Sequence, residues 1–245
     1  GYDLAGIRSE KIDTFIENMK NAAETETFKK CKEVLLAHAD EFRNVTREDI
    51  ESISPYICNS ATISTLHGCP PQEIESIADY LLKEKKLHTF IKCNPTLLGY
   101  EFARGTLDRM GYDYIAFGRF HFDDDLQYAD AVPMLERLMK LSKEMNLEFG
   151  VKITNTFPVD VKAGELPSEE MYMSGKSLFP LSISLAARLS REFDGKLRIA
   201  YSGGADAFNI QRIVGAGVWP VTVATTILKP GGYQRLKQMA ETVDR

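Results

Sequence analysis

Short runs of β-branched and aromatic residues alternate along this chain with amphipathic helical segments, and this alternation limits the folds that it can adopt. The predicted strands lie at residues 61–66, 88–93, 113–118, 148–154, 197–202 and 220–226. Between the first two, Ile74, Ile77, Ala78 and Leu81 have the i, i+3, i+4, i+7 spacing of a helix with one apolar face. Strands that alternate with helices indicate βα units and an α/β fold.

The predicted strands are nearly continuous apolar runs, so we expect a parallel sheet covered by helices on both faces. Either a (β/α)8 barrel or an open doubly wound sheet fits this pattern. No GxGxxG motif follows a predicted strand, which weakens the dinucleotide-binding alternative. Residues 1–60 are charged and helical and are expected to form one long crossover. Residues 157–175 are expected to form a long loop with little regular structure.

The bulk composition excludes several classes of partner. A formal net charge of −5 gives no basic surface, so nucleic acid is not an expected partner. No apolar run approaches the ~20 residues of a membrane helix. The four cysteines form no CxxC pair, so the segment shows no zinc or iron–sulfur site. With no signal segment either, a reducing cytoplasm is the default location. The first residues, GYDLAG, lack Met and read like the end of a strand, so we expect a fragment of a longer protein.

The ends of the last two predicted strands carry the clearest ligand signal. Ser202, Gly203 and Gly204 follow one strand, and Thr225 and Thr226 end the next. A glycine pair after a strand presents backbone N–H groups to an anion, and the following helix adds its positive N-terminal end. Barrels often bind phosphate between their last two strands. The alternative is a tight turn that needs glycine for its backbone conformation.

Other strand ends carry single reactive side chains. Lys92 could lie against an anionic ring, form a Schiff base, or pair with a carboxylate. Asn155 offers amide groups to a heterocycle, or caps a loop. Cys69 precedes a proline pair at a helix start, where a thiol pKa is lowered, or it is a buried structural thiol. His67 could polarise a substrate or cap its loop.

The segment RFHFDDDL (119–126) combines His121 with Asp123, Asp124 and Asp125. These residue types resemble a metal site. An acidic run of this kind more often begins a solvated helix, and we prefer that interpretation.

Six motifs occur in an order that resembles the flavin-binding barrel of the dihydroorotate and dihydropyrimidine dehydrogenases. They are STLHGC, TFIKCNPT, VKITNT, MSGKSLFPLSISLA, AYSGGAD and VTVATTIL. The resemblance is strongest to proteins described as selenate reductase subunits related to dihydropyrimidine dehydrogenase, and it covers nearly the whole chain. It implies a (β/α)8 TIM barrel of the dihydroorotate dehydrogenase type, with residues 1–245 as a single FMN-binding domain and the N-terminal strands missing from this chain.

The resemblance also implies residue roles. Lys92 would contact the flavin ring, and Cys69 would be the catalytic proton donor. The FMN phosphate would be held by Gly175, Ser202, Gly203, Gly204, Thr225 and Thr226. The substrate would be bound by His67, Asn94, Asn155 and Thr156. Thr62 and Thr65 stand where the simple dehydrogenases have Asn and Cys, which leaves the substrate open.

The function that we expect is therefore hydride exchange between FMN and a planar, nitrogenous heterocycle, with Cys69 supplying the proton on the opposite face. By resemblance, electrons would arrive through FAD, NAD(P)H and iron–sulfur domains or subunits outside this segment. Two alternatives stay open. One is a lyase that forms a Schiff base on Lys92 and holds a sugar phosphate. The other is a flavin-free barrel that serves as a scaffold for electron-transfer domains.

Overall fold

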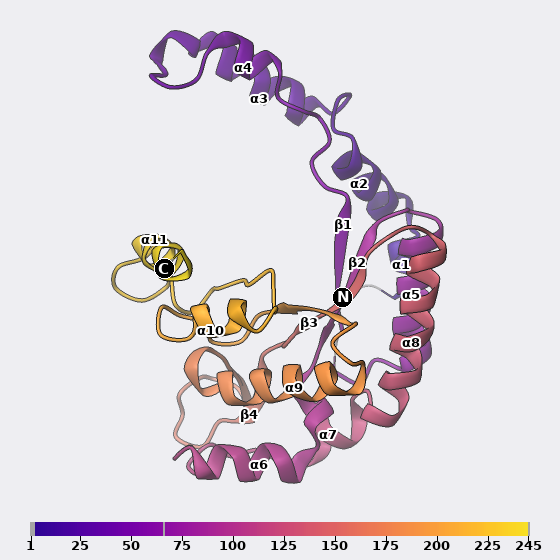
Figure 1. Cartoon of the computed structure of the whole chain (residues 1–245), viewed down its shortest axis with the longest axis vertical. Coiled ribbons are helices and arrows are strands. Elements are labelled where there is room, and N and C mark those ends of the chain that lie inside the picture. Colours follow the sequence, from indigo (N-terminus) through magenta and orange to yellow (C-terminus); the bar gives the residue numbers. More distant parts are fainter. Residues whose placement is uncertain (1–2, 66, 245) are drawn as a thin grey trace. The chain divides into compact units, whose positions relative to one another are not determined.

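A computed structural model describes residues 3–65 and 67–244, which divide into two units at residues 60 and 61 (Figure 1). The first unit is helical, as predicted. Its elements are α1 (Leu4–Ile7), α2 (Glu10–Lys20), α3 (Glu26–Ala37), η1 (Ala39–Glu41) and α4 (Arg47–Glu51). Asp3 caps α1 by accepting a hydrogen bond from the Gly6 N–H at 2.8 Å. Asp3 and Leu4 thus begin a helix and do not end a strand, while Gly1 and Tyr2 lie outside the described residues.

Local capping explains where the helices of the first unit begin. Thr25 accepts a hydrogen bond from the Phe28 N–H at the start of α3. Thr46 and Asp49 form a reciprocal capping box at the start of α4, which packs against α3. The segment is thus a set of short helices and not the single long crossover predicted from its charge.

The second unit contains the sheet that positions the strand ends. Its strands are β1 (Ser60–Ser64), β2 (His88–Cys93), β3 (Phe149–Ile153) and β6 (Arg198–Tyr201), in the order β1-β2-β3-β6. β2, β3 and β6 are parallel. A parallel bridge joins Tyr201 to Val221, so residues 220–226 supply one bridge where a strand was predicted. Leu66, the last residue of the first predicted strand, lies outside the described residues.

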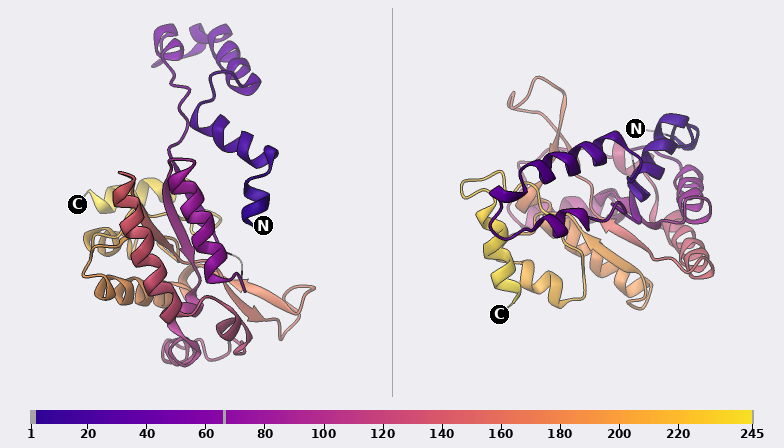
Figure 2. Two further views of the ribbon diagram at one scale, coloured as in Figure 1. Left: turned by 90° about the vertical axis from the view of Figure 1, so that its right-hand side faces the viewer. Right: turned by 90° about the horizontal axis from the view of Figure 1, so that it is seen from above.

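Helices follow the strands and cover the sheet, as the sequence pattern predicted. They are α5 (Pro71–Lys83), η2 (Pro95–Leu98), α6 (Tyr100–Arg109), α7 (Phe120–Asp124), α8 (Tyr128–Glu144), η3 (Gly175–Ser177), α9 (Phe179–Glu192), α10 (Ile210–Gly215) and α11 (Gln234–Val243). α5 packs on β2, and α8 and α9 pack on β3. Figure 2 shows α5 beside α8, where Arg137 and Glu75 pair at 2.7 Å. None of the helices that the structure describes is long and apolar enough to span a membrane.

Two segments differ from their sequence predictions. Residues 113–118 form no strand; Ile115 and Phe117 instead pack on the core, where the Phe117 ring lies 4.9 Å from that of Phe157. Residues 157–175, predicted to be irregular, contain the antiparallel strands β4 (Phe157–Asp160) and β5 (Glu170–Met173). The hairpin extends away from the sheet (Figure 2). The first error arises because a short apolar segment packs equally well as a strand or as a core-covering loop.

Candidate functional site

The carboxyl ends of the strands meet at one edge of the sheet. Lys92 on β2 is the register partner of Lys152 on β3, and Ile153 is that of Tyr201 on β6. The Asn155 N–H donates to the Cys93 carbonyl at 2.8 Å, which joins the segments that follow β2 and β3. The residues just beyond each strand therefore lie together, as the α/β pattern predicted.

A cavity of about 180 Å³ lies at this edge. It is lined by all seven residues proposed from sequence as flavin contacts, namely Lys92, Gly175, Ser202, Gly203, Gly204, Thr225 and Thr226. Thr156, one of the predicted substrate residues, also lines it. The structure thus gathers in one place residues separated by up to 134 positions in the chain (226 − 92).

Gly203 and Gly204 form a cradle that has no room for side chains. A Cβ on Gly203 would meet the Ser182 hydroxyl, and one on Gly204 would meet the carbonyl oxygen of Gly175. The Gly203 carbonyl accepts from the Tyr201 hydroxyl at 2.8 Å, and the Gly204 carbonyl accepts from the Asn209 amide at 3.0 Å. Within residues 3–65 and 67–244, the N–H groups of the two glycines donate to no protein acceptor. Both remain free to bind an anion.

The charged side chains of the cavity favour an anion. Lys92, Lys176 and Lys229 line it together with one acidic residue, Asp206. Lys176 Nζ lies 3.6 Å from Oδ2 of Asp206. The other carboxylate oxygen of Asp206, Oδ1, accepts a hydrogen bond from the Phe208 N–H. The acid is thus partly neutralised, and two lysines remain in excess.

Lys92 is a half-buried lysine with a perturbed pKa. Burial lowers the pKa of its ammonium group, and the neighbouring Lys152 ammonium lowers it further. Burial also lowers the pKa of Lys152. The two cations therefore gain from an electron-rich ligand that offsets their charge.

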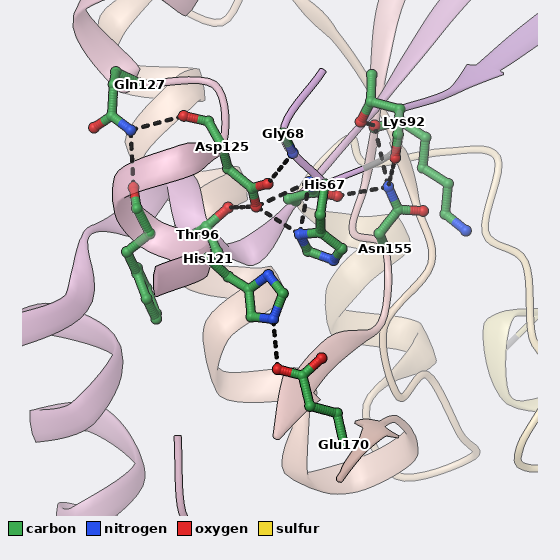
Figure 3. Close-up of polar contacts among 12 residues, drawn as sticks. His67, Gly68, Lys92, Thr96, His121, Asp125, Gln127, Asn155 and Glu170 are labelled. Atoms are coloured by element: carbon green, nitrogen blue, oxygen red, sulfur yellow. Dashed lines mark hydrogen bonds and ion pairs between the residues drawn. The ribbon is translucent and has the colours of Figure 1, made fainter. Parts of the chain in front are cut away.

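A second polar cluster lies beside the cavity and is centred on Asp125 (Figure 3). One of its carboxylate oxygens lies 2.7 Å from His67 Nδ1, 2.6 Å from the Thr96 hydroxyl and 3.1 Å from the Asn94 amide nitrogen. The other accepts from the Gly68 N–H at 2.9 Å. Burial raises the pKa of Asp125, but hydrogen bonds from His67, Thr96 and Gly68 outweigh it and lower the pKa below its usual value.

Three of the predicted substrate residues belong to this network. The Asn155 amide donates to Asn94 Oδ1 at 2.7 Å and to the Thr65 carbonyl at 3.1 Å. Asn94 in turn reaches Asp125 and, at 3.4 Å, His67 Nδ1. Hydrogen bonds therefore connect the residues at the end of β3 with the loop that follows β1.

Cys69 lies apart from the cavity. It lines a separate small pocket with Asn94 and mainly apolar residues, and it packs partly buried against the core. Burial raises the pKa of the Cys69 thiol, and the charge of Glu73 raises it further. The expected lowering by the helix N-terminus is therefore wrong, because desolvation and a nearby carboxylate outweigh it.

The acidic segment 119–126 is not a uniformly solvated helix start. Among the described residues, no group of three or more His, Cys, Asp or Glu side chains could hold a metal ion. His121 Nε2 bonds Glu170 of the hairpin at 2.8 Å, whereas Asp125 is buried in the network described above. Of the three aspartates, only Asp123 and Asp124 are exposed.

The family described as "Oxidoreductase YgfK, N-terminal TIM-barrel domain" matches residues 1–245. This chain belongs to that family. Membership in the YgfK family confirms the predicted TIM-barrel fold. The chain is 49% identical over 247 residues to proteins named "Putative oxidoreductase YgfK" from Escherichia coli strains K12 and O157:H7. The match covers 96% of this chain and 24% of each relative, so the chain spans about a quarter of their length.

Two solved structures resemble the chain more distantly. A crystal structure of DHODH from Eimeria tenella in complex with ferulenol is 14% identical, with a TM-score of 0.43 over 77% of this chain and 49% of its own. A crystal structure of ligand-free type DHODH from Eimeria tenella has a TM-score of 0.39 and 14% identity. The match covers 71% of this chain and 56% of the DHODH chain.

Sequence reasoning missed several residues at this edge. Asp125, the centre of the polar cluster, was predicted to belong to a solvated acidic run. Its signal was weak, because only its position next to Leu126 and Gln127 distinguished it from Asp123 and Asp124. Lys176 and Lys229 were also missed, although Lys176 lies within the motif MSGKSLFPLSISLA and Lys229 directly follows VTVATTIL.

Proposed function

We propose that this domain binds FMN in the cavity and exchanges hydride between the flavin and a planar heterocyclic substrate. The observation that carries the proposal is the convergence of seven predicted flavin contacts on one cavity. The oxidoreductase description of the YgfK family supports a redox role.

The cavity fits the phosphate of such a cofactor. The free N–H groups of Gly203 and Gly204 would hold phosphate oxygens, and the hydroxyls of Thr225 and Thr226 would complete the cup. The excess of lysine side chains would balance the phosphate charge. When bound, FMN would supply the hydride chemistry, and the protein would supply orientation and electrostatics.

Lys92 would act on the flavin ring and not on the phosphate. It belongs to a strand, whereas the glycine cradle lies in the loop after β6. Its ammonium group is desolvated and lies near a second cation, so an electron-rich ring edge would stabilise it. This would orient the ring toward Thr156 and Asn155.

The substrate would contact the residues that follow β3. The Asn155 amide nitrogen is already engaged by protein acceptors. Its side-chain oxygen accepts from the Ser64 hydroxyl at 3.4 Å, and its second lone pair is the site left for a substrate N–H. The raised pKa of Cys69 keeps its thiol protonated at neutral pH, which suits a proton donor. Cys69 lines a different pocket from the proposed flavin cavity, however, and this position argues against the role.

The relatives are about four times as long as the segment that matches this chain. We propose that FAD, NAD(P)H and iron–sulfur groups elsewhere in such a protein exchange electrons with this domain. The partners of the domain would then be its small-molecule substrate and those electron-transfer domains or subunits.

The lowered pKa of Lys92 also favours a second candidate, a lyase. A lysine whose amine pKa is lowered, beside an anion-binding cradle, is the arrangement that a Schiff-base enzyme needs for a phosphorylated carbonyl substrate. Borohydride trapping of such a substrate on Lys92 would support this candidate.

The decisive experiment is a visible absorbance spectrum of the purified, full-length protein, with the released cofactor identified by mass. We expect about one FMN per chain in the wild type and none in a Lys92→Ala, Gly204→Asp double variant. Gly217→Asp is the control, because Gly217 has a similar positive φ of 78° and no atom lies within 4 Å of the position that a Cβ would occupy. Absence of flavin from the wild type, even after FMN is added, would overturn the proposal.

A further inference from the structure

Asp125 is the most constrained ionisable group at the carboxyl edge of the sheet. Its side chain is 1% exposed, and its donors come from the segments that follow β1 and β2. Three donors converge on one carboxylate oxygen and a backbone N–H occupies the other. A carboxylate surrounded by donors acts only as an acceptor, so the hydrogen between Asp125 and His67 belongs to the imidazole.

This arrangement fixes the tautomer of His67. The proton sits on Nδ1, which lies 2.7 Å from Asp125, so Nε2 is the basic nitrogen of the neutral ring. Within the described part of the chain, Nε2 has no hydrogen-bond partner. The side chain is 20% exposed, and its ring is held by Asp125.

His67 also lies close to the proposed substrate residues. Asn94 bonds Asp125 and lies 3.4 Å from His67 Nδ1, and its carbonyl oxygen accepts from Asn155. Asn155 stands between Thr154 and Thr156, both of which line the cavity. A flat substrate that contacts Asn155 would therefore lie within a few hydrogen-bond lengths of the imidazole.

We propose that Asp125 is a positioning residue that holds His67 as the proton-transfer group of this domain; the inference rests on the flavin function proposed above. The substrate is the planar heterocycle of that proposed function, and the test below probes it with pyrimidines, whose ring C=C bond can take up a hydride and a proton. When bound, FMN would supply a hydride to one carbon, and protonated His67 would give its Nε2 proton to the other. The substrate C=C bond would become C–C with two new C–H bonds, the hydride would carry both electrons, and His67 would regain a proton from solvent.

The other titratable groups near His67 are less suited to this role. The His121 ring lies 5.0 Å from that of His67, but its Nε2 is engaged by Glu170. Asp124 approaches Gly68 and is exposed. Cys69 lines a separate apolar pocket. A proton donor needs both hydrogen-bond reach and a held orientation, and His67 combines an open nitrogen with a buried carboxylate partner.

The first test reads the tautomer without turnover. In full-length protein labelled with 15N-histidine, the His67 signals are assigned by comparison with His67→Gln. We expect the Nδ1–H form in the wild type and in Asp125→Glu, and a mixture with the Nε2–H form in Asp125→Asn. An unchanged tautomer in Asp125→Asn would overturn the positioning role.

The second test uses the FMN-loaded protein, reduced chemically and mixed with uracil, thymine or orotate as probes. His67→Gln is expected to slow flavin reoxidation by about 10²–10⁴-fold, the usual contribution of a positioned acid or base. Asp125→Asn is expected to be slow as well and to have an altered pH–rate profile, and Asp125→Glu should recover part of the rate. FMN content is measured in the wild type and in every variant. Absence of FMN from the wild type would contradict the proposed function, whereas a slow variant that keeps its FMN tests the role of His67.

Two outcomes of the second test contradict the inference while FMN stays bound. One is a Cys69→Ala variant that loses turnover while His67→Gln keeps it, which would return the proton to the thiol. The other is no reoxidation of wild-type flavin by any of the three probes, which would exclude the assigned substrate class.

Discussion

Lys92 and Lys152 are register partners on adjacent parallel strands, and the pKa of each ammonium group is lowered by burial. The charge of Lys152 lowers the pKa of Lys92 further. Two partly desolvated cations side by side on β2 and β3 cost folding free energy, because no described side chain forms an ion pair with either one. An electron-rich ligand in the cavity would offset that cost, and this couples ligand binding to protonation.

We therefore expect FMN affinity to fall at alkaline pH. In the free protein Lys92 loses its proton below the ordinary lysine range, and an anionic or electron-rich ligand binds the protonated form better. Affinity should decrease as pH rises through this lowered pKa, and binding should take up protons in that range. Titration calorimetry in two buffers of different ionisation enthalpy measures the proton uptake.

Two variants assign this effect. Lys92→Met should weaken binding and remove the alkaline dependence, whereas Lys152→Met should move it to higher pH, because the like charge beside Lys92 is gone. Proton uptake that persists unchanged in Lys92→Met would show that another group is responsible.

The glycine cradle makes a steric prediction. Gly204 has a φ of +73°, and a Cβ there would collide with the Gly175 carbonyl. Gly204→Ala should lose phosphate and FMN binding and should destabilise the second unit by more than the roughly 1–2 kcal/mol that a positive φ alone costs. Urea unfolding followed by Trp219, the only tryptophan, reports this change.

Gly217→Ala is the matched control for the cradle. Gly217 has a φ of +78° and open space around it, so its substitution should cost about 1–2 kcal/mol and leave binding intact. Equal costs at positions 204 and 217 would contradict the close packing of the cradle.

The sequence predicted the framework of the site better than its chemistry. Alternating strands and helices place every strand end at one edge, so residues such as Gly203 and Thr225 could be grouped without coordinates. Of the six strands predicted from apolar runs, four are present, and all four lie in one sheet. Residues 113–118 are a similar short apolar run but cover the core as a loop, and composition alone does not distinguish the two uses.

Charge environments could not be predicted in the same way. Asp125 and Asp123 are two positions apart in one acidic run, yet the first is buried among four donors and the second is exposed. The pKa of Cys69 depends on desolvation and on Glu73, whereas the residue pattern indicated only a helix start. Such properties depend on contacts between segments far apart in the chain.

Thiol reactivity gives a third prediction. Burial raises the pKa of Cys93 to about 12 and also raises that of Cys69, whereas Cys31 is exposed. Because the thiolate is the reactive form, iodoacetamide at pH 8 should modify Cys31 first, Cys69 slowly, and Cys93 only after unfolding. Mass spectrometry of timed digests measures the order. Fast labelling of Cys69 would contradict its raised pKa and would favour the helix N-terminus as the dominant influence.

Acid unfolding gives a fourth prediction, which concerns Asp125. Although burial raises its pKa, the hydrogen bonds from His67, Thr96 and Gly68 lower it overall. A carboxyl whose pKa is lower in the folded state stabilises the fold above its ordinary value of 3.8, and this stabilisation is lost as pH falls through the lowered pKa. Asp125→Asn should therefore cost stability at pH 7, by about 1–3 kcal/mol for the buried donors left poorly paired. The cost should shrink at pH 3, where the wild type binds a proton at this carboxyl on unfolding.

Urea unfolding monitored at Trp219 measures the cost at both pH values. Asp123→Asn, at the exposed neighbour in the same acidic run, should change the stability at neither pH. A cost for Asp125→Asn that is the same at both pH values would mean that the carboxylate is not the group that the donors stabilise.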